Sequence, residues 1–170
     1  MAGIRRQKKL YSRPMKPYDS ERIREENSVS KKYGLKNKRE IWKAEAKVTR
    51  LRGLAKKLIT APLEEQEKFI SKLIEMGFLN PESNKIDSVL EMKKEDYLNR
   101  RLQTVVYKKG IAKSLKHARQ LVTHKYIRVG NRVINIPSYI VNVGEEKAVS
   151  VVASKPKGEA KAVLTEEKNA

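Results

Sequence analysis

The clearest pattern of apolar and polar positions lies between residues 97 and 137. At its start, apolar side chains recur at intervals of three and four, which is the period of an amphipathic helix. The acidic pair Glu95–Asp96 in front of this pattern suits a helix N-terminus, and Gly110 after a run of lysines suits its end. We therefore expect one continuous helix. Its apolar stripe consists of Leu98, Leu102, Val105 and Val106.

A second amphipathic helix is predicted after this glycine. Ser114 is a favourable N-cap, because its hydroxyl can accept a hydrogen bond from a free backbone N–H of the first turn. The apolar side chains that follow again keep helical spacing, so one face of the helix should be buried. That inner face consists of Leu115, Ala118 and Val122.

A β-hairpin is predicted next. Gly130–Asn131 has the composition of a two-residue turn between the strands Tyr126–Val129 and Arg132–Ile136, and Pro137 ends the second strand. A two-residue turn also fixes the register, because side chains alternate between the two faces of a strand. The side chains expected on the buried face are Ile127, Val129, Ile134 and Ile136.

The charge of this segment indicates what it binds. Residues 97–137 hold ten Lys or Arg and no Asp or Glu, so a well-patterned fold carries charge of one sign. Residues 1–60 hold 19 basic and 6 acidic residues, whereas residues 61–96 hold 5 basic and 9 acidic ones. With a net charge of +19, the chain should associate with a polyanion. Two basic blocks around an acidic one predict two contact surfaces on that polyanion.

Several short motifs in this segment resemble the alpha-L RNA-binding motif, which recurs in ribosomal proteins, pseudouridine synthases and some tRNA synthetases. They are R-R-L-Q-T (Arg100–Thr104), A-R-Q-L-V (Ala118–Val122), Y-I-x-V-G-N-R (Tyr126–Arg132) and I-P-S-Y (Ile136–Tyr139). Together with K-Y-G-L-K-N-K-R-E-I-W (Lys32–Trp42), they make the chain from about Lys8 to Val152 similar to the "S four" family of small-subunit ribosomal proteins, in its archaeal and eukaryotic form. The turn departs from the family, which more often has Asn-Gly or Asp-Gly there.

The resemblance implies a non-catalytic constituent of the small ribosomal subunit, located in the cytoplasm within the ribosome. Its implied partners are small-subunit ribosomal RNA, at a junction in the 5′ domain, and neighbouring small-subunit proteins. The resemblance also implies early binding in subunit assembly and a place near the mRNA entrance, with mRNA as a further partner. It implies neither a cofactor nor a small-molecule substrate.

Outside the central segment, helices dominate the expected structure. A polar helix capped by Asp19 should run to Tyr33 and end at Gly34, and a long amphipathic helix should follow Asn37, with Glu40 completing a capping box. A third helix should end at Gly77, a short one should cover 86–90, and strands are expected at 138–143 and 148–152 around a turn. We thus predict an α+β protein, with a helical N-terminal part followed by two helices packed on a short antiparallel sheet.

The expected division of the chain follows this reading. Residues 1–20 should form an extended basic arm that orders on RNA, residues 21–96 a helical domain, residues 97–153 the alpha-L module with its C-terminal strands, and residues 154–170 a disordered tail. The predicted RNA-binding residues of the module are Arg100, Arg101, Gln103, Thr104, Lys108, Lys113, Lys116, Arg119, Gln120, His124, Lys125, Arg128 and Arg132. Those of the N-terminal part are Arg5, Arg6, Lys8, Lys9, Lys38, Arg39, Lys43, Lys47 and Arg50.

The sequence offers little for other functions. His117 and His124 are seven residues apart with no cysteine in the chain, so no metal site is predicted, and no glycine-rich phosphate loop follows a strand. No apolar run reaches the roughly 20 residues of a membrane span, and the start of the chain lacks a secretory signal. The alternative is a non-ribosomal RNA- or DNA-binding protein, since a helix-turn-helix also enters DNA grooves. Basic residues spread over both helices and the hairpin favour RNA.

Overall fold

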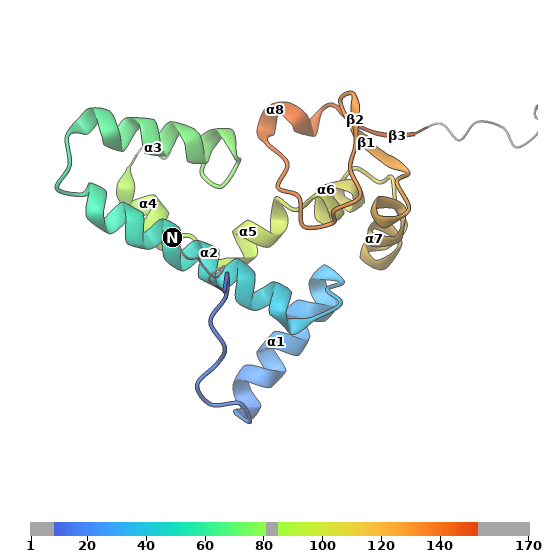
Figure 1. Ribbon diagram of the computed structural model, residues 1–170, viewed down its shortest axis with the longest axis horizontal. Coiled ribbons are helices and arrows are strands. Elements are labelled where there is room, and N and C mark those ends of the chain that lie inside the picture. Colours follow the sequence, from blue (N-terminus) through green and yellow to red (C-terminus); the bar gives the residue numbers. More distant parts are fainter. Residues whose placement is uncertain (1–8, 81–84, 153–170) are drawn as a thin grey trace, which may run out of the picture.

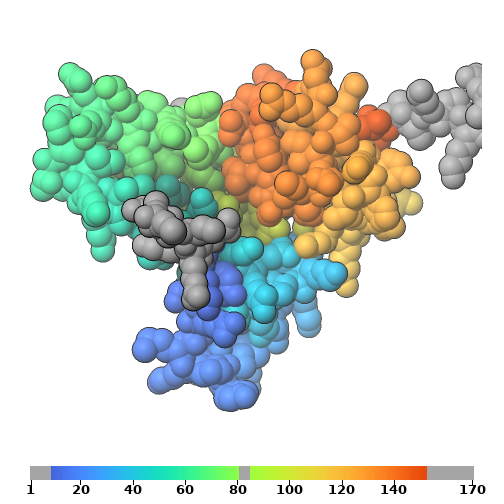
Figure 2. All heavy atoms as spheres, viewed as in Figure 1, coloured from blue at the N-terminus to red at the C-terminus, as the bar shows by residue number. Residues whose placement is uncertain are grey.

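The computed structural model describes residues 9–80 and 85–152 of the chain. Figure 1 shows a long central helix, α2, with α1 packed across one end and α3 folded back along the other. A smaller unit of short helices and strands lies beyond α2, and Figure 2 shows it as a lobe beside the one that contains α3. The long helices are α1 (Ser20–Tyr33), α2 (Lys38–Leu58) and α3 (Leu63–Glu75).

The ends of these helices follow local sequence signals, as predicted. The Asp19 carboxylate accepts a hydrogen bond from the backbone N–H of Glu21, and Gly34 closes α1 in the left-handed conformation, with φ of +59°. At α3, Gly77 also has a positive φ, and the N–H of Phe78 reaches back to the carbonyl of Leu73, as in a Schellman cap. Such caps satisfy backbone groups that have no partner inside the helix.

Between α3 and the sheet, the described residues form four short helices. The helix predicted at 86–90 is present as α4, whereas the single helix predicted after residue 95 is divided into α5 and α6. The prediction was wrong at Arg101, whose backbone is extended with φ −70° and ψ 141°. The bounds are α4 (Ile86–Glu91), α5 (Lys94–Asn99), α6 (Leu102–Lys108) and α7 (Leu115–Thr123).

The break between α5 and α6 has a long-range cause that the local sequence pattern does not reveal. The N–H of Leu102 donates to the carbonyl of Tyr139 at 2.7 Å, and the N–H of Val141 donates to the carbonyl of Arg100 at 3.0 Å. A segment 40 residues downstream therefore takes backbone groups that a continuous helix would use internally. The same contacts explain why residues 138–143 form no strand, apart from one bridge between Arg101 and Ile140.

The sheet has three antiparallel strands in the order β2-β1-β3. The two-residue turn is confirmed, because Val129 pairs with Arg132 across it, and the predicted last strand is present and pairs with β1. The return strand is shorter than predicted, and Ile136 is 55% exposed where burial was expected. The short helix α8 replaces the predicted turn at Gly144. The bounds are β1 (Ile127–Val129), β2 (Arg132–Val133), α8 (Val143–Glu146) and β3 (Val149–Val151).

Three clusters of buried apolar side chains hold these elements together. The largest lies between residues 102 and 149 and joins α6, α7 and the sheet. We use the term module for residues 97–152, which contain this cluster. A second joins α1 and α2 to Leu98 of α5, and a third packs α3 and α4 on the far end of α2. The second cluster therefore belongs to both halves of the protein and helps to fix one against the other.

Close packing at Gly34 makes it a critical residue of this arrangement. A Cβ atom there would lie 2.9 Å from Cβ of Leu115 and 3.2 Å from Nε2 of Gln103, in addition to the cost of its positive φ. We expect Gly34→Ala to lower the free energy of unfolding by about 2–4 kcal/mol, combining backbone strain with overpacking. Gly110→Ala is the matched control, because Gly110 also has a positive φ but open space around it. Denaturant unfolding of both variants measures the difference, and equal losses would contradict the close packing.

Candidate nucleic-acid interface

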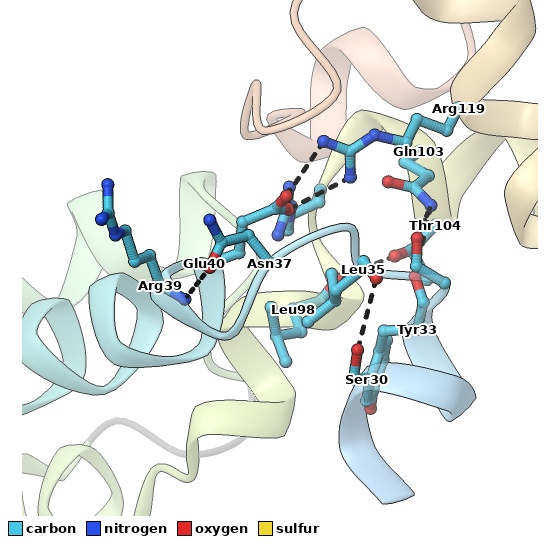
Figure 3. A network of polar contacts seen from close by, with 12 residues as sticks. Ser30, Tyr33, Leu35, Asn37, Arg39, Glu40, Leu98, Gln103, Thr104 and Arg119 are labelled. Carbon is cyan, nitrogen blue, oxygen red and sulfur yellow. Dashed lines mark hydrogen bonds and ion pairs between the residues drawn. The ribbon is translucent and has the colours of Figure 1, made fainter. Parts of the chain in front are cut away.

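One carboxylate joins the two halves of the protein. Glu40, in the first turn of α2, faces Arg119 from α7 (Figure 3). It also contacts Arg101, which lies in the link between α5 and α6. Nη2 of Arg101 lies 2.5 Å from Oε2 of Glu40, and Arg119 makes two hydrogen bonds of 2.9 and 3.3 Å to the two carboxylate oxygens. Glu40 thus does not complete the predicted capping box with Asn37.

The electrostatics of this cluster favour the ionised carboxylate. Burial by itself opposes the charge of Glu40, but the hydrogen bonds from Arg119 and Arg101 outweigh burial and lower its pKa below the ordinary value of 4.5. The Arg101 side chain is only 4% exposed, and that of Arg119 is 25% exposed. Arg101 therefore has no route to RNA in this conformation, which corrects its predicted role.

Gln103 and Thr104 also lie inside the protein, in contrast to their predicted position against RNA. Nε2 of Gln103 donates to the backbone carbonyls of Tyr33, Gly34 and Leu115 at 2.9–3.2 Å, and the side chain is 1% exposed. The Thr104 hydroxyl donates to the carbonyl of Leu98 at 2.9 Å. Both side chains lock helix ends together, so we assign them structural roles instead.

Arg100 also has partners within the protein. Its guanidinium lies over Gly77, donates to the carbonyl of Val141 at 2.8 Å, and pairs with Glu146 at 2.8 Å. This side chain connects the end of α3 to the C-terminal part of the module. Since both of its terminal nitrogens have protein partners, RNA could recruit Arg100 only by breaking these contacts.

The other predicted residues of the module are on the surface. We call this set the module face. All its members are exposed, and they come from α6, α7, the hairpin and the connections on either side of α7, so the positive charge is not confined to one helix. The module face consists of Lys108, Lys113, Lys116, Gln120, His124, Lys125, Arg128 and Arg132.

A second set of cations lies along α2. Arg39, Lys43, Lys47 and Arg50 are exposed and separated by four, four and three residues, which places them on one side of the helix. This α2 stripe extends over roughly 16 Å at 1.5 Å per residue. Within the described residues none of the four pairs with a carboxylate. The stripe therefore keeps its charge for an external partner.

The remaining predicted RNA-binding residues of the N-terminal part differ in whether they are free to contact RNA. Lys9 is exposed, whereas Lys38 pairs with Glu26 at 3.4 Å. Arg5, Arg6 and Lys8 lie outside the described residues. The sequence reasoning also missed Lys109, an exposed cation whose Nζ donates to the carbonyl of Val149 at 3.3 Å, although it lies in the same lysine run as Lys108.

The described residues show no alternative chemistry. No three His, Cys, Asp or Glu side chains among them lie close enough to hold a metal ion. His117 instead accepts a hydrogen bond at Nδ1 from the backbone N–H of Lys113, at the start of α7. No helix in the described ranges is long and apolar enough to cross a bilayer.

Comparisons with known proteins show what the chain is similar to. Residues 100–147 match the family model of the S4 domain. The small ribosomal subunit protein uS4 of Methanothermobacter thermautotrophicus is 44% identical over 160 residues, which cover 92% of this chain and 93% of that protein. The uS4 proteins of Ignicoccus hospitalis and Korarchaeum cryptofilum are each 42% identical, over 92% and 88% of this chain and 96% and 91% of theirs.

Glu40 provides a test of the cluster. We expect Glu40→Gln to lower the free energy of unfolding by about 3 kcal/mol at neutral pH, because a buried arginine loses its counter-charge. The folded-state pKa is depressed, so the stabilisation is present above about pH 4.5 and is lost as pH falls through the folded-state value. The gap between wild type and variant should therefore close in acid. Denaturant unfolding across pH measures it, with exposed Glu45→Gln as the control.

Lys125 provides a test of the module face. Within the described ranges it is the one non-glycine residue with positive φ, +64°, and it occupies the helix-end position that glycine holds after α1, α3 and α6. This conformation costs a side chain about 1 kcal/mol or more, a strain typical of functional positions.

We expect Lys125→Gly to change stability and RNA affinity in opposite directions. It should raise the free energy of unfolding by about 1 kcal/mol and reduce the salt dependence of RNA binding by about one phosphate contact. Lys116→Ala, which removes a charge without relieving strain, should weaken binding with no gain in stability. Unchanged RNA binding by Lys125→Gly would remove Lys125 from the interface.

Proposed function

Because the chain belongs to the uS4 family of small ribosomal subunit proteins, we propose that it binds one folded junction of small-subunit ribosomal RNA through two surfaces, the α2 stripe and the module face. At the coarser level, it is a structural protein of the small ribosomal subunit that binds RNA. The proposed role involves no chemical step.

The observation that carries the proposal is the set of hydrogen bonds that connects the elements bearing the two basic surfaces. Glu40 bridges α2 to Arg101 and Arg119, and Gln103 bridges the end of α1 to α7. The angle between the surfaces is therefore set before RNA binds, and the protein selects RNA helices that converge at a matching angle.

The chemistry of RNA supports this mode of recognition. A-form helices hide their base edges in a deep, narrow groove, so a protein on them contacts phosphates, 2′-hydroxyls and overall shape. Exposed lysines and arginines on two rigid elements can offset phosphate repulsion where two helices approach each other. Binding then favours the compact form of the junction.

The location within the subunit rests on the family resemblance. We propose that the junction lies in the 5′ domain of the ribosomal RNA and that the protein binds early in assembly. We place it near the mRNA entrance, beside other small-subunit proteins and within reach of mRNA, in the cytoplasm. The basic N-terminal arm would order on the RNA, as the charge of residues 1–20 favours.

A salt titration with two triple variants tests the two-surface proposal. Affinity of the full chain should fall roughly thousandfold between 50 and 200 mM salt if about six to ten phosphates are contacted. Replacing Arg39, Lys43 and Arg50 with alanine should reduce the log–log slope by about two to three, and so should replacing Lys113, Lys116 and Arg128. Each variant should also lose preference for the junction over a simple duplex.

The control removes the same charge from the acidic part of the chain. Lys68, Lys72 and Lys85 are exposed on or near α3 and α4, outside both surfaces, and their replacement with alanine should leave the slope and the preference almost unchanged. Equal effects of all three triple variants would mean that RNA binding depends only on the net charge of the protein and not on the two surfaces. Tighter binding of duplex DNA than of the RNA junction would favour the DNA-binding alternative.

A further inference from the structure

A groove lies at the seam between α2 and the module. It encloses about 400 Å³. Its lining includes Lys43 and Lys47 of the α2 stripe, Pro137 and Ser138 of the module, and Tyr97. The groove thus combines apolar and cationic side chains and is built by both halves of the protein.

We propose that this groove receives a single unpaired nucleotide of the bound RNA, with its base against Tyr97 and Pro137 and its phosphates near Lys43 and Lys47. The proposal rests on the RNA-binding function proposed above. The proposed ligand differs from the phosphates discussed above. Phosphates on a duplex surface can be contacted while every base stays paired, whereas this groove would receive a base that has left its helix.

The size of the groove selects this ligand. Sites for small molecules enclose roughly 300–1,000 Å³, so 400 Å³ suits one nucleotide. An A-form duplex is far too wide to enter a space of this volume. Only an extruded or single-stranded residue of the RNA can therefore reach the bottom of the groove.

Tyr97 has the properties of a base-binding side chain. Its ring is half-buried and held by a stacked contact with Phe78, with centroids 5.6 Å apart and planes at 17°. A ring fixed in this way loses little entropy when a base stacks on it or contacts its edge. The hydroxyl forms no hydrogen bond with any described residue, so it can donate to or accept from a base edge.

The charges of the groove favour a phosphate-bearing ligand. Glu40 also lines the groove, but Arg101 and Arg119 already bind both of its carboxylate oxygens. Lys43 and Lys47 have no carboxylate partner among the described residues. The groove therefore has an excess of positive charge beside its apolar side chains, which matches a nucleotide better than a neutral or cationic group.

The test compares two RNA probes that differ at one position. A short RNA duplex, with and without a single extruded 2-aminopurine, is titrated with the full chain at fixed salt. The extruded probe should bind roughly tenfold more tightly, as expected for one base on an aromatic side chain, and its fluorescence should be quenched on binding.

Two variants and one control assign the effect to the groove. Ser138→Trp places a bulky side chain at an exposed rim position and should abolish the preference while leaving duplex affinity and melting temperature unchanged. The double variant Lys43→Ser, Lys47→Ser should weaken binding of the extruded probe more than binding of the paired duplex. Ser71→Trp, on the exposed side of α3, should change nothing.

The outcomes separate this inference from the proposed function. Equal affinity for both probes, or a preference that survives Ser138→Trp, overturns the nucleotide site while RNA binding stands. Failure of the chain to bind either probe overturns RNA binding itself. A poly-glutamate peptide that binds the wild type and loses its affinity in Ser138→Trp would identify a protein ligand and overturn the nucleotide assignment.

Discussion

The pairing of Glu40 with two arginines determines how this protein presents its charge. The carboxylate lies in the first turn of a 21-residue helix, and its partners come from two different elements of the module. Buried or half-buried ion pairs often contribute little net stability, because desolvation offsets their attraction. What this pair contributes is geometry, since both carboxylate oxygens are satisfied only when α2, the α5–α6 link and α7 meet in one arrangement.

Hydrogen bonds between uncharged groups, next to the Glu40–arginine cluster, further restrict how the two halves can be oriented. The Gln103 amide binds three carbonyls at the ends of α1 and α7, and a side chain at Gly34 would enter the space that Leu115 and Gln103 occupy. Unlike an ion pair, the hydrogen bonds of the Gln103 amide join uncharged groups and are insensitive to salt and pH. The ion pairs of Glu40 and the hydrogen bonds of Gln103 therefore fix the angle between the halves under conditions in which either type of interaction alone would weaken.

The sequence could predict the elements whose signals are local. Helix caps at Asp19, Gly34 and Gly77, the hairpin turn, and the amphipathic stripe of α7 were all read correctly, because each depends on residues within a few positions of one another. The break at Arg101 and the loss of a strand at 138–143 could not be predicted, since both follow from hydrogen bonds across 40 residues. The S4 domain itself was recognisable from its motifs.

The candidate site was harder to predict, for the same reason. Residues 97–137 contain no acidic residue, so every cation in them looked available to RNA. The counter-charge of Arg101 and Arg119 is Glu40, 61 and 79 residues earlier in the chain. Lys113 and Lys116 are exposed, as charge alone suggests, and their contact with RNA stays a prediction.

The chemistry of the two side chains explains why the buried cations are arginines. A guanidinium is planar and weakly hydrated and presents several donors in a fixed fork, so it can be buried against a carboxylate and carbonyls, whereas an ammonium is a strongly hydrated point charge. Arg22, Arg52, Arg100 and Arg101 are accordingly buried or half-buried and bind carboxylates or backbone carbonyls, whereas the lysines of α6 and α7 remain exposed. Arg39, Arg50, Arg128 and Arg132 also remain exposed. A charge of +19 therefore overstates the charge available to RNA, because part of it stabilises the frame that holds the rest in position.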